Sequence, residues 1–202
     1  MRCGRKRQKL NNRGLTLIEM VIAIAIIGIF STVVMTFITS GANFYRKTSI
    51  TTKLQSDMQT TLERIENAIM DTNKSIAYTY SNGGSAIEND INQPVTAEKE
   101  VVCTSTDLSV SAKEGDCLLT IFQWSPSEQI LYYNEGFIKD GKKSVNTASR
   151  AVLTENVSGF QADISKAKSE GIVLFRLTLK KGDKEISQLY TVTLRNKVSA
   201  EP

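Results

Sequence analysis

Apolar residues are concentrated in one stretch near the start of the chain. The run from Leu15 to Ile38 has 24 residues, and Glu19 is its only charged residue. At a helical rise of about 1.5 Å per residue this run extends about 36 Å, which is enough to cross the hydrocarbon core of a bilayer. The pattern therefore predicts a transmembrane helix over residues 15–38.

Beyond this run the apolar residues become sparser but keep a helical spacing. Six of them recur every three or four positions, with polar and charged residues between them: Ile50, Leu54, Met58, Leu62, Ile65 and Ile69. This spacing places them on one face of a helix and does not fit the alternation of a strand. We predict an amphipathic helical stalk over residues 39–73, whose apolar face packs on the domain that follows. No proline occurs before Pro94, so one helix is expected from about Leu15 to about Thr72.

After residue 73 the pattern changes from helical to strand-like, and residues 74–202 are predicted to form a β-rich domain. Residues 81–117 are rich in Ser, Asn, Gly, Thr and acidic residues, and are expected to form an exposed loop region. Alternation in the last two predicted strands indicates an antiparallel sheet with one face on the helix and one face in water. The predicted strands are Ile76–Tyr80, Cys117–Trp124, Gln129–Tyr133 with Gly136–Ile138, Phe160–Ile164, Ile172–Leu179 and Glu185–Leu194. The fold class is therefore α+β.

The positive charge of the chain belongs to its first residues. The net charge is +4, but residues 1–14 hold six of the 25 basic residues and no acidic residue, so the other 19 basic residues face 21 acidic ones. The rest of the chain therefore gives no charge argument for binding nucleic acid. A basic segment before an apolar helix stays in the cytoplasm, which predicts a single-pass precursor in the cytoplasmic (inner) membrane whose C-terminal domain is extracytoplasmic.

Two cysteines lie together in the predicted domain. Apart from Cys3 in the basic leader, the chain has only Cys103 and Cys117, and a bond between them would close a loop of 15 residues. An extracytoplasmic compartment favours disulfide formation, so we predict a Cys103–Cys117 disulfide. The alternative is a pair of unbonded thiols.

Three interpretations of the N-terminal region compete. A secretory signal peptide cut near residues 39–42 would have an unusually long apolar core, and an uncleaved signal anchor leaves Glu19 unexplained. A cut between Gly14 and Leu15 explains it, because the new α-amino group of Leu15 lies one helical turn from Glu19. That amine, and more usefully the amine of a neighbouring copy, can pair with the carboxylate and offset the cost of placing a charge in the membrane.

These residues resemble the N-terminus of type IV prepilins and type II secretion pseudopilins. The likeness rests on the stretch from Gly14 to Met20 and on residues 25–29, with Gly28 at the position of the family's usual helix glycine. It implies removal of the leader, residues 1–14, by a prepilin peptidase, N-methylation of Leu15 and a role for Glu19 in subunit assembly. It also implies a pilin-like fold, and partners that include other pilin or pseudopilin subunits, the peptidase and the membrane.

Two features of the chain favour a minor subunit within this resemblance. Thr36 stands where major pilins usually carry a helix-kinking proline, and the C-terminal domain is large and strand-rich. The domain is similar to the larger minor pseudopilins, of the J-type or ComGF-like group. The implied function is assembly into a type IV pilus or into a secretion or competence pseudopilus. The alternative is a membrane-anchored extracytoplasmic binding module that does not polymerise.

The sequence contains no recognisable catalytic set. It has no histidine, no phosphate-binding loop and no nucleophile motif. The acidic segment Glu88–Asn92 lacks the spacing of a calcium loop. We therefore predict a structural protein rather than an enzyme, with no cofactor, no bound metal and no small-molecule substrate.

Overall fold

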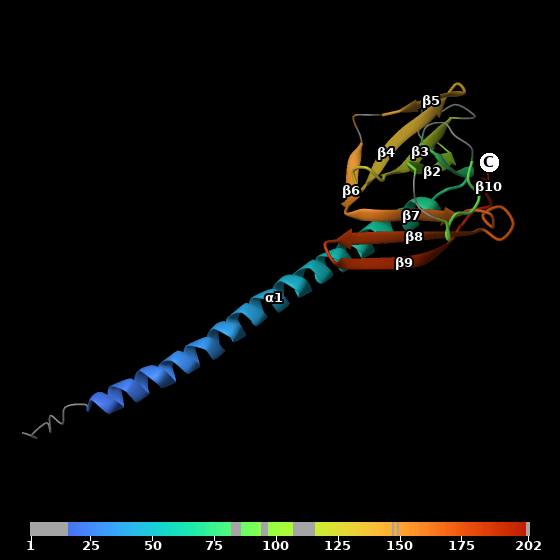
Figure 1. Ribbon diagram of the computed structural model, residues 1–202. Coiled ribbons are helices and arrows are strands. Elements are labelled where there is room, and N and C mark those ends of the chain that lie inside the picture. Colours follow the sequence, from blue (N-terminus) through green and yellow to red (C-terminus); the bar gives the residue numbers. More distant parts are fainter. Residues whose placement is uncertain are drawn as a thin grey trace, which may run out of the picture. The chain divides into compact units, whose positions relative to one another are not determined.

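The computed structural model describes residues 16–81, 86–93, 97–106, 116–146, 148 and 150–200 (Figure 1). The contacts within the chain divide it into two compact units, Met1–Thr48 and Ser49–Pro202. One helix, α1 (Leu17–Met70), begins in the first unit and ends in the second. Its observed ends agree with the single long helix that the proline-free sequence predicts.

The C-terminal part of α1 forms the central helix of the second unit. Five of the six predicted apolar positions are buried, and the sixth, Ile50, is partly buried against the same core. The other side of this segment is polar, and Lys53, Arg64 and Asn67 are exposed. The predicted apolar face is therefore confirmed, and it is the face that packs on the domain.

Two sheets pack with this helical segment in the second unit. The larger sheet has the strand order β10-β1-β2-β3-β4-β5, and β6 also pairs with β4. All of its pairs are antiparallel except that of β1 with β10. Its strands are β1 (Ser75–Tyr80), β2 (Lys99–Thr106), β3 (Cys117–Ser125), β4 (Ile130–Lys139), β5 (Lys142–Val145), β6 (Ala151–Glu155) and β10 (Ser199–Ala200).

The smaller sheet is an antiparallel meander of three strands. They are β7 (Val157–Asp163), β8 (Ile172–Lys181) and β9 (Lys184–Thr193), and Figure 1 shows them side by side. Along β8, Val173, Phe175, Leu177 and Leu179 are buried and alternate with partly exposed residues, as the sequence predicts. Gly182 has a φ of 59° in the two-residue turn between β8 and β9, a conformation that favours glycine.

One hydrophobic core joins α1 and both sheets. It combines the apolar face of the helix with buried side chains from β1, β2, β3 and β4 of the larger sheet and from β7, β8 and β9 of the smaller one. The indole N–H of Trp124 in β3 donates a hydrogen bond to the carbonyl of Val157 in β7, with a nitrogen–oxygen distance of 3.2 Å. On α1, Glu66 accepts a hydrogen bond from the phenol of Tyr190 in β9 at 2.7 Å.

The α+β class is confirmed, but two details of the predicted sheet are wrong. The strands form two sheets, and the larger one has buried apolar residues on both faces, because Val102, Leu119 and Ile121 form a second cluster apart from the main core. The predicted loop region, residues 81–117, also contains β2, which lies between β1 and β3. The Thr and Ser residues of β2 made its composition resemble that of a loop, although Val101, Val102 and Cys103 are consecutive and all buried.

Replacing Leu177 with alanine tests the packing of the smaller sheet. Leu177 is fully buried, whereas Leu189 in the neighbouring strand is 48% exposed. We expect Leu177→Ala to lower the free energy of unfolding by about 2–5 kcal/mol and the matched control Leu189→Ala by less than about 0.5 kcal/mol. Trp124 is the only tryptophan and is buried, so its fluorescence reports unfolding of the full-length protein in detergent. Equal losses in the two variants would contradict this packing.

Candidate functional site

The first described residues form a reciprocal cap at the N-terminal end of α1. The carboxylate of Glu19 accepts hydrogen bonds from the backbone N–H and from the hydroxyl of Thr16, each at 2.9 Å. In return, the backbone N–H of Glu19 donates to the hydroxyl oxygen of Thr16 at 3.4 Å. This is a capping box, in which two side chains bind backbone N–H groups that have no partner within the helix.

The cap explains locally why Glu19 occurs in an apolar helix. A carboxylate in the first turn also interacts favourably with the positive end of the helix dipole. Glu19 is exposed, so its side chain is within reach of a second molecule. Thr16 is the functional residue that sequence analysis missed, although the spacing Thr-x-x-Glu before an apolar run is a readable signal for a cap.

The other predicted residues of this site, Gly14 and Leu15, lie outside the described residues. The cut between them and the methylation of Leu15 therefore stay predictions. Leu15 directly precedes Thr16 in the chain. A cut after Gly14 would place a new α-amino group one residue before the cap.

The helix that follows presents an apolar surface within the first unit. The large apolar side chains between Leu17 and Ile38 are all exposed, from Val34 at 39% to Leu17 at 84%. By length and composition α1 is apolar enough to cross a membrane, and none of its most apolar 18-residue stretch is buried. A soluble protein rarely exposes so continuous an apolar surface, so this surface requires lipid or other apolar helices around it.

The few polar side chains of this segment are satisfied within the helix itself. The hydroxyls of Ser31, Thr32, Thr36 and Thr39 each donate to a backbone carbonyl three or four residues earlier, at 2.7–3.0 Å. Such bonds lower the cost of placing a hydroxyl in a medium without water. Thr36, which stands where major pilins usually carry proline, continues the helix in this way.

The structure does not contain the predicted disulfide, and this prediction is corrected. No bond joins Cys103 and Cys117, which are both buried. In the antiparallel register Cys117 lies opposite Thr106, three residues along β2 from Cys103. That separation is about 10 Å along the strand, and an odd offset directs the two side chains to opposite faces of the sheet. A disulfide requires Cα atoms within about 7 Å, so this register excludes the bond.

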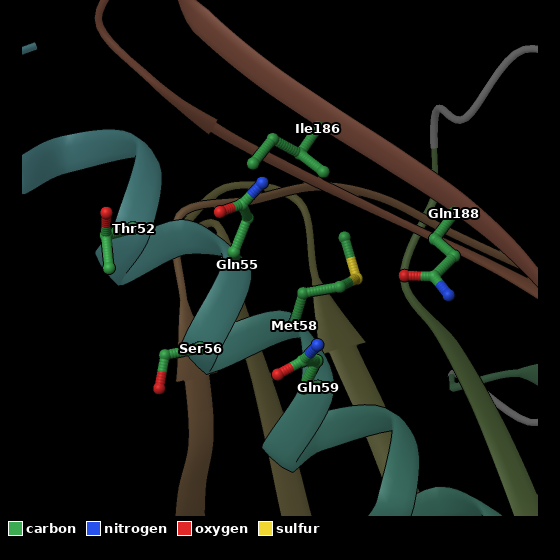
Figure 2. A pocket seen from close by; sticks show the side chains of 7 residues that line it. All are labelled: Thr52, Gln55, Ser56, Met58, Gln59, Ile186 and Gln188. Carbon is green, nitrogen blue, oxygen red and sulfur yellow. The ribbon is translucent and has the colours of Figure 1, made fainter. Parts of the chain in front are cut away.

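A groove of about 450 Å³ lies in the second unit, between α1 and β9 (Figure 2). Figure 2 shows Gln55 extending from the helix towards Ile186. The residues that line the groove carry amide, hydroxyl or apolar side chains: Thr52, Gln55, Ser56, Met58, Gln59, Ile186 and Gln188. None of these seven has an ionisable side chain, so they contain no acid–base pair.

The described part of the chain also shows no candidate metal site. No cluster of three or more Cys, Asp or Glu side chains there is arranged to hold an ion, and the whole sequence has no histidine. Within the acidic segment Glu88–Asn92, Asp90 is buried and faces a lysine instead.

Comparison with known proteins supports the N-terminal site. Residues 9–35 match a family model described as the prokaryotic N-terminal methylation motif. Searches of curated proteins and of solved structures find no significant match. The motif supports a place in the type IV pilin and pseudopilin family and points to a structural subunit rather than an enzyme. It implies processing by a prepilin peptidase and interaction with other pilin subunits, and together with the apolar helix it fits a membrane-anchored, single-pass precursor.

Stability at high pH is expected to depend on Cys103. Burial raises the pKa of its thiol to about 12, although a hydrogen bond with Thr72 acts in the opposite direction. In the unfolded chain a thiol loses its proton near pH 8.5, so between about pH 9 and 12 the unfolded state binds fewer protons than the folded state and stability falls as pH rises. Cys103→Ala should make this decline shallower by up to about 1.4 kcal/mol per pH unit. Chemical unfolding of both proteins at pH 7, 9 and 10, followed by Trp124 fluorescence, measures the difference, and parallel declines would contradict the prediction.

Proposed function

We propose that this protein is a minor subunit of a type IV pilus or of a secretion or competence pseudopilus. It is made as a precursor, cut after Gly14 and methylated on Leu15, and it assembles through the N-terminal part of α1. The observation that carries this proposal is the methylation motif at residues 9–35, which includes most of the exposed apolar segment of α1.

The exposed apolar surface supports assembly through this helix. Side chains such as Ile22, Ile29 and Phe30 need an apolar environment both before and after the chain leaves the bilayer. Lipid provides that environment for the precursor, and the equivalent helices of neighbouring subunits provide it in a fibre. The hydroxyl groups of this segment bond within their own helix, so they need no partner when the environment changes.

Glu19 supports a specific register for this packing. In the single chain its carboxylate accepts only hydrogen bonds from Thr16, so its negative charge has no cation among the described residues nearby. The α-amino group that cutting creates at Leu15 of a neighbouring subunit provides that cation. An ion pair in an apolar medium is strongly favoured over two separated charges, and this preference would select one axial position of the incoming helix.

The minor role rests on Thr36 and on the C-terminal domain. Thr36 continues α1 where major pilins usually have proline, and the second unit has two sheets on one helix segment. We place this unit outside the cytoplasm, because the basic leader stays inside. Within the minor subunits, the chain is similar to the J-type or ComGF-like group.

The second candidate function is a membrane-anchored binding module that does not polymerise. The uncharged groove between α1 and β9 favours it, because amide and hydroxyl groups suit a neutral ligand such as an extended peptide. This module needs an intact anchor but needs neither a cut after Gly14 nor a charge at Glu19.

Mass spectrometry of the mature N-terminus separates the two functions. The pilin proposal predicts a chain that begins at Leu15 with a methylated α-amino group. A Gly14→Ala variant is the control, since a block at the cut site should leave the basic leader attached. A wild-type chain that still begins at Met1, or one that begins near Ala42, would refute the proposal.

Two matched variants test whether the charge of Glu19 or its capping role drives assembly. Glu19→Gln keeps a side chain that can cap the helix but removes the charge, whereas Thr16→Ala removes the cap hydroxyl and keeps the charge. We expect Glu19→Gln to be cut normally but its incorporation into fibres to fall at least tenfold, and Thr16→Ala to retain most of its incorporation.

Immunoblots of sheared fibres and of membranes from the same cells measure incorporation and cutting separately. Normal incorporation of Glu19→Gln would contradict the proposed charge pairing. Loss of incorporation in both variants would assign the role to the cap instead.

A further inference from the structure

A lysine and an aspartate are buried together in the second unit. The side chains of Lys99, at the start of β2, and Asp90, in the segment 86–93, are only 4% and 3% exposed, and Nζ of Lys99 lies against Oδ2 of Asp90. The ion pairs Lys166–Glu170 and Lys180–Glu185, by contrast, are half exposed. Lys and Asp are rarely buried so completely, because removing both charges from water carries a large desolvation cost. A surface ion pair has no such cost, so the burial of this pair needs a separate explanation.

The carboxyl group of Asp90 is held by a different donor on each oxygen. The phenol O–H of Tyr78 donates to Oδ2 at 2.9 Å, and the backbone N–H of Ala162 donates to Oδ1 at 3.0 Å. The two oxygens are therefore not equivalent. Oδ1 is held by a fixed backbone donor, whereas Oδ2 contacts both the amine and a side chain that can give up a proton.

The backbone around Asp90 is held as firmly as its side chain. The amide of Gln161 donates to the carbonyls of Asp90 and Gln93 at 3.1 and 2.6 Å, and Arg176 donates to the carbonyl of Ile91 at 2.6 Å. These bonds fix the segment that carries the Asp90 carboxyl group, whose Oδ2 contacts Nζ of Lys99. Because folding already holds the two groups close together, the reaction itself does not carry the entropy cost of bringing two reactants together.

We propose that Lys99 and Asp90 are joined by an intramolecular isopeptide bond. Nζ attacks Cγ of Asp90, the Nζ–Cγ bond forms and the Cγ–Oδ2 bond breaks. Two of the three ammonium protons of Lys99 end on Oδ2, which leaves as water, and the third stays on the amide nitrogen. The products are one amide and one water molecule, so the reaction needs no oxidant, cofactor or activating group.

The surrounding donors match the needs of this reaction. Transfer of one proton from the ammonium to the carboxylate removes both charges from an environment without water and leaves an amine that can attack. The N–H of Ala162 is placed to stabilise the negative charge that develops on Oδ1. Tyr78 is placed to pass a proton to Oδ2 and to regain one from the attacking nitrogen.

Burial affects this site in two further ways. Burial first, and then the charge and hydrogen bond of Asp90, raise the pKa of Tyr78, so the phenol is protonated before the reaction and can donate to Oδ2. Burial also keeps water away from the amide and opposes its hydrolysis. The bond would close the chain between residues 90 and 99 and fix the segment 86–93, which also pairs with β7 through Asn89 and Asp163, against β2.

Tryptic digestion of the full-length protein, denatured after purification in detergent, tests the proposal. Without the bond, trypsin releases peptides 75–99 and 100–113. With the bond, Lys99 resists cleavage, and a single peptide 75–113 is expected, lighter by one water molecule than its sequence requires. The bond closes residues 90–99 into a ring, so a single backbone break within this ring should not release separate fragments in the mass spectrometer.

Variants identify the residues involved. Lys99→Arg should restore cleavage after residue 99 and the full mass, with its fold checked by Trp124 fluorescence. Tyr78→Phe should lower the bonded fraction at least tenfold at equal times after synthesis, and an unchanged fraction would overturn the role given to Tyr78.

Peptides 75–99 and 100–113 of full mass from the wild-type protein would overturn the bond itself. Loss of water at Asp90 with normal cleavage after Lys99 indicates a succinimide and would also overturn it. None of these outcomes depends on pilus assembly.

Discussion

The apolar face of α1 is the constraint on which the second unit depends. Leu54, Met58, Ile65 and Ile69 are each about 1% exposed, and the core around them takes side chains from both sheets. The smaller sheet does not enclose a core alone, because it has only three strands and buries one face. The helix provides the surface that both sheets share, and the Trp124–Val157 and Glu66–Tyr190 hydrogen bonds join the parts at its margins.

The same helix has a different role in its N-terminal half. There the apolar side chains are exposed, the hydroxyl groups bond within the helix, and the charged residue in the first turn caps its end. The hydroxyl groups between Ser31 and Thr39 therefore have partners within their own helix. In the proposed assembly these groups would neither gain nor lose a hydrogen-bond partner when the helix moves from lipid to protein surroundings.

In the proposed assembly, Glu19 would have a role both in the single chain and in the fibre. The cap with Thr16 gives one carboxylate oxygen, Oε2, two hydrogen-bond donors while the chain is alone, which lowers the cost of the exposed charge at the helix end. Its net charge is not neutralised by the cap, because both donors are uncharged. The α-amino group of a neighbouring subunit would therefore form an ion pair with a carboxylate that is still charged.

The sequence alone determined the parts of this protein that depend on local periodicity. The length of α1, its apolar face from Ile50 to Ile69, the alternation in β8 and the N-terminal motif all follow from residue spacing, because side chains repeat every 3.6 positions in a helix and every two in a strand. The Thr16–Glu19 cap was also readable from its spacing.

Only the tertiary structure decided the features that depend on strand pairing. These are the division into two sheets, the inner position of β2, the separation of Cys103 from Cys117 and the meeting of Lys99 with Asp90. Register across a sheet brings together residues whose separation along the chain does not indicate contact. A shift of one residue changes the face to which every side chain points. For this reason two cysteines 14 positions apart lie on opposite faces, while a lysine and an aspartate in a segment expected to be an exposed loop lie buried against each other.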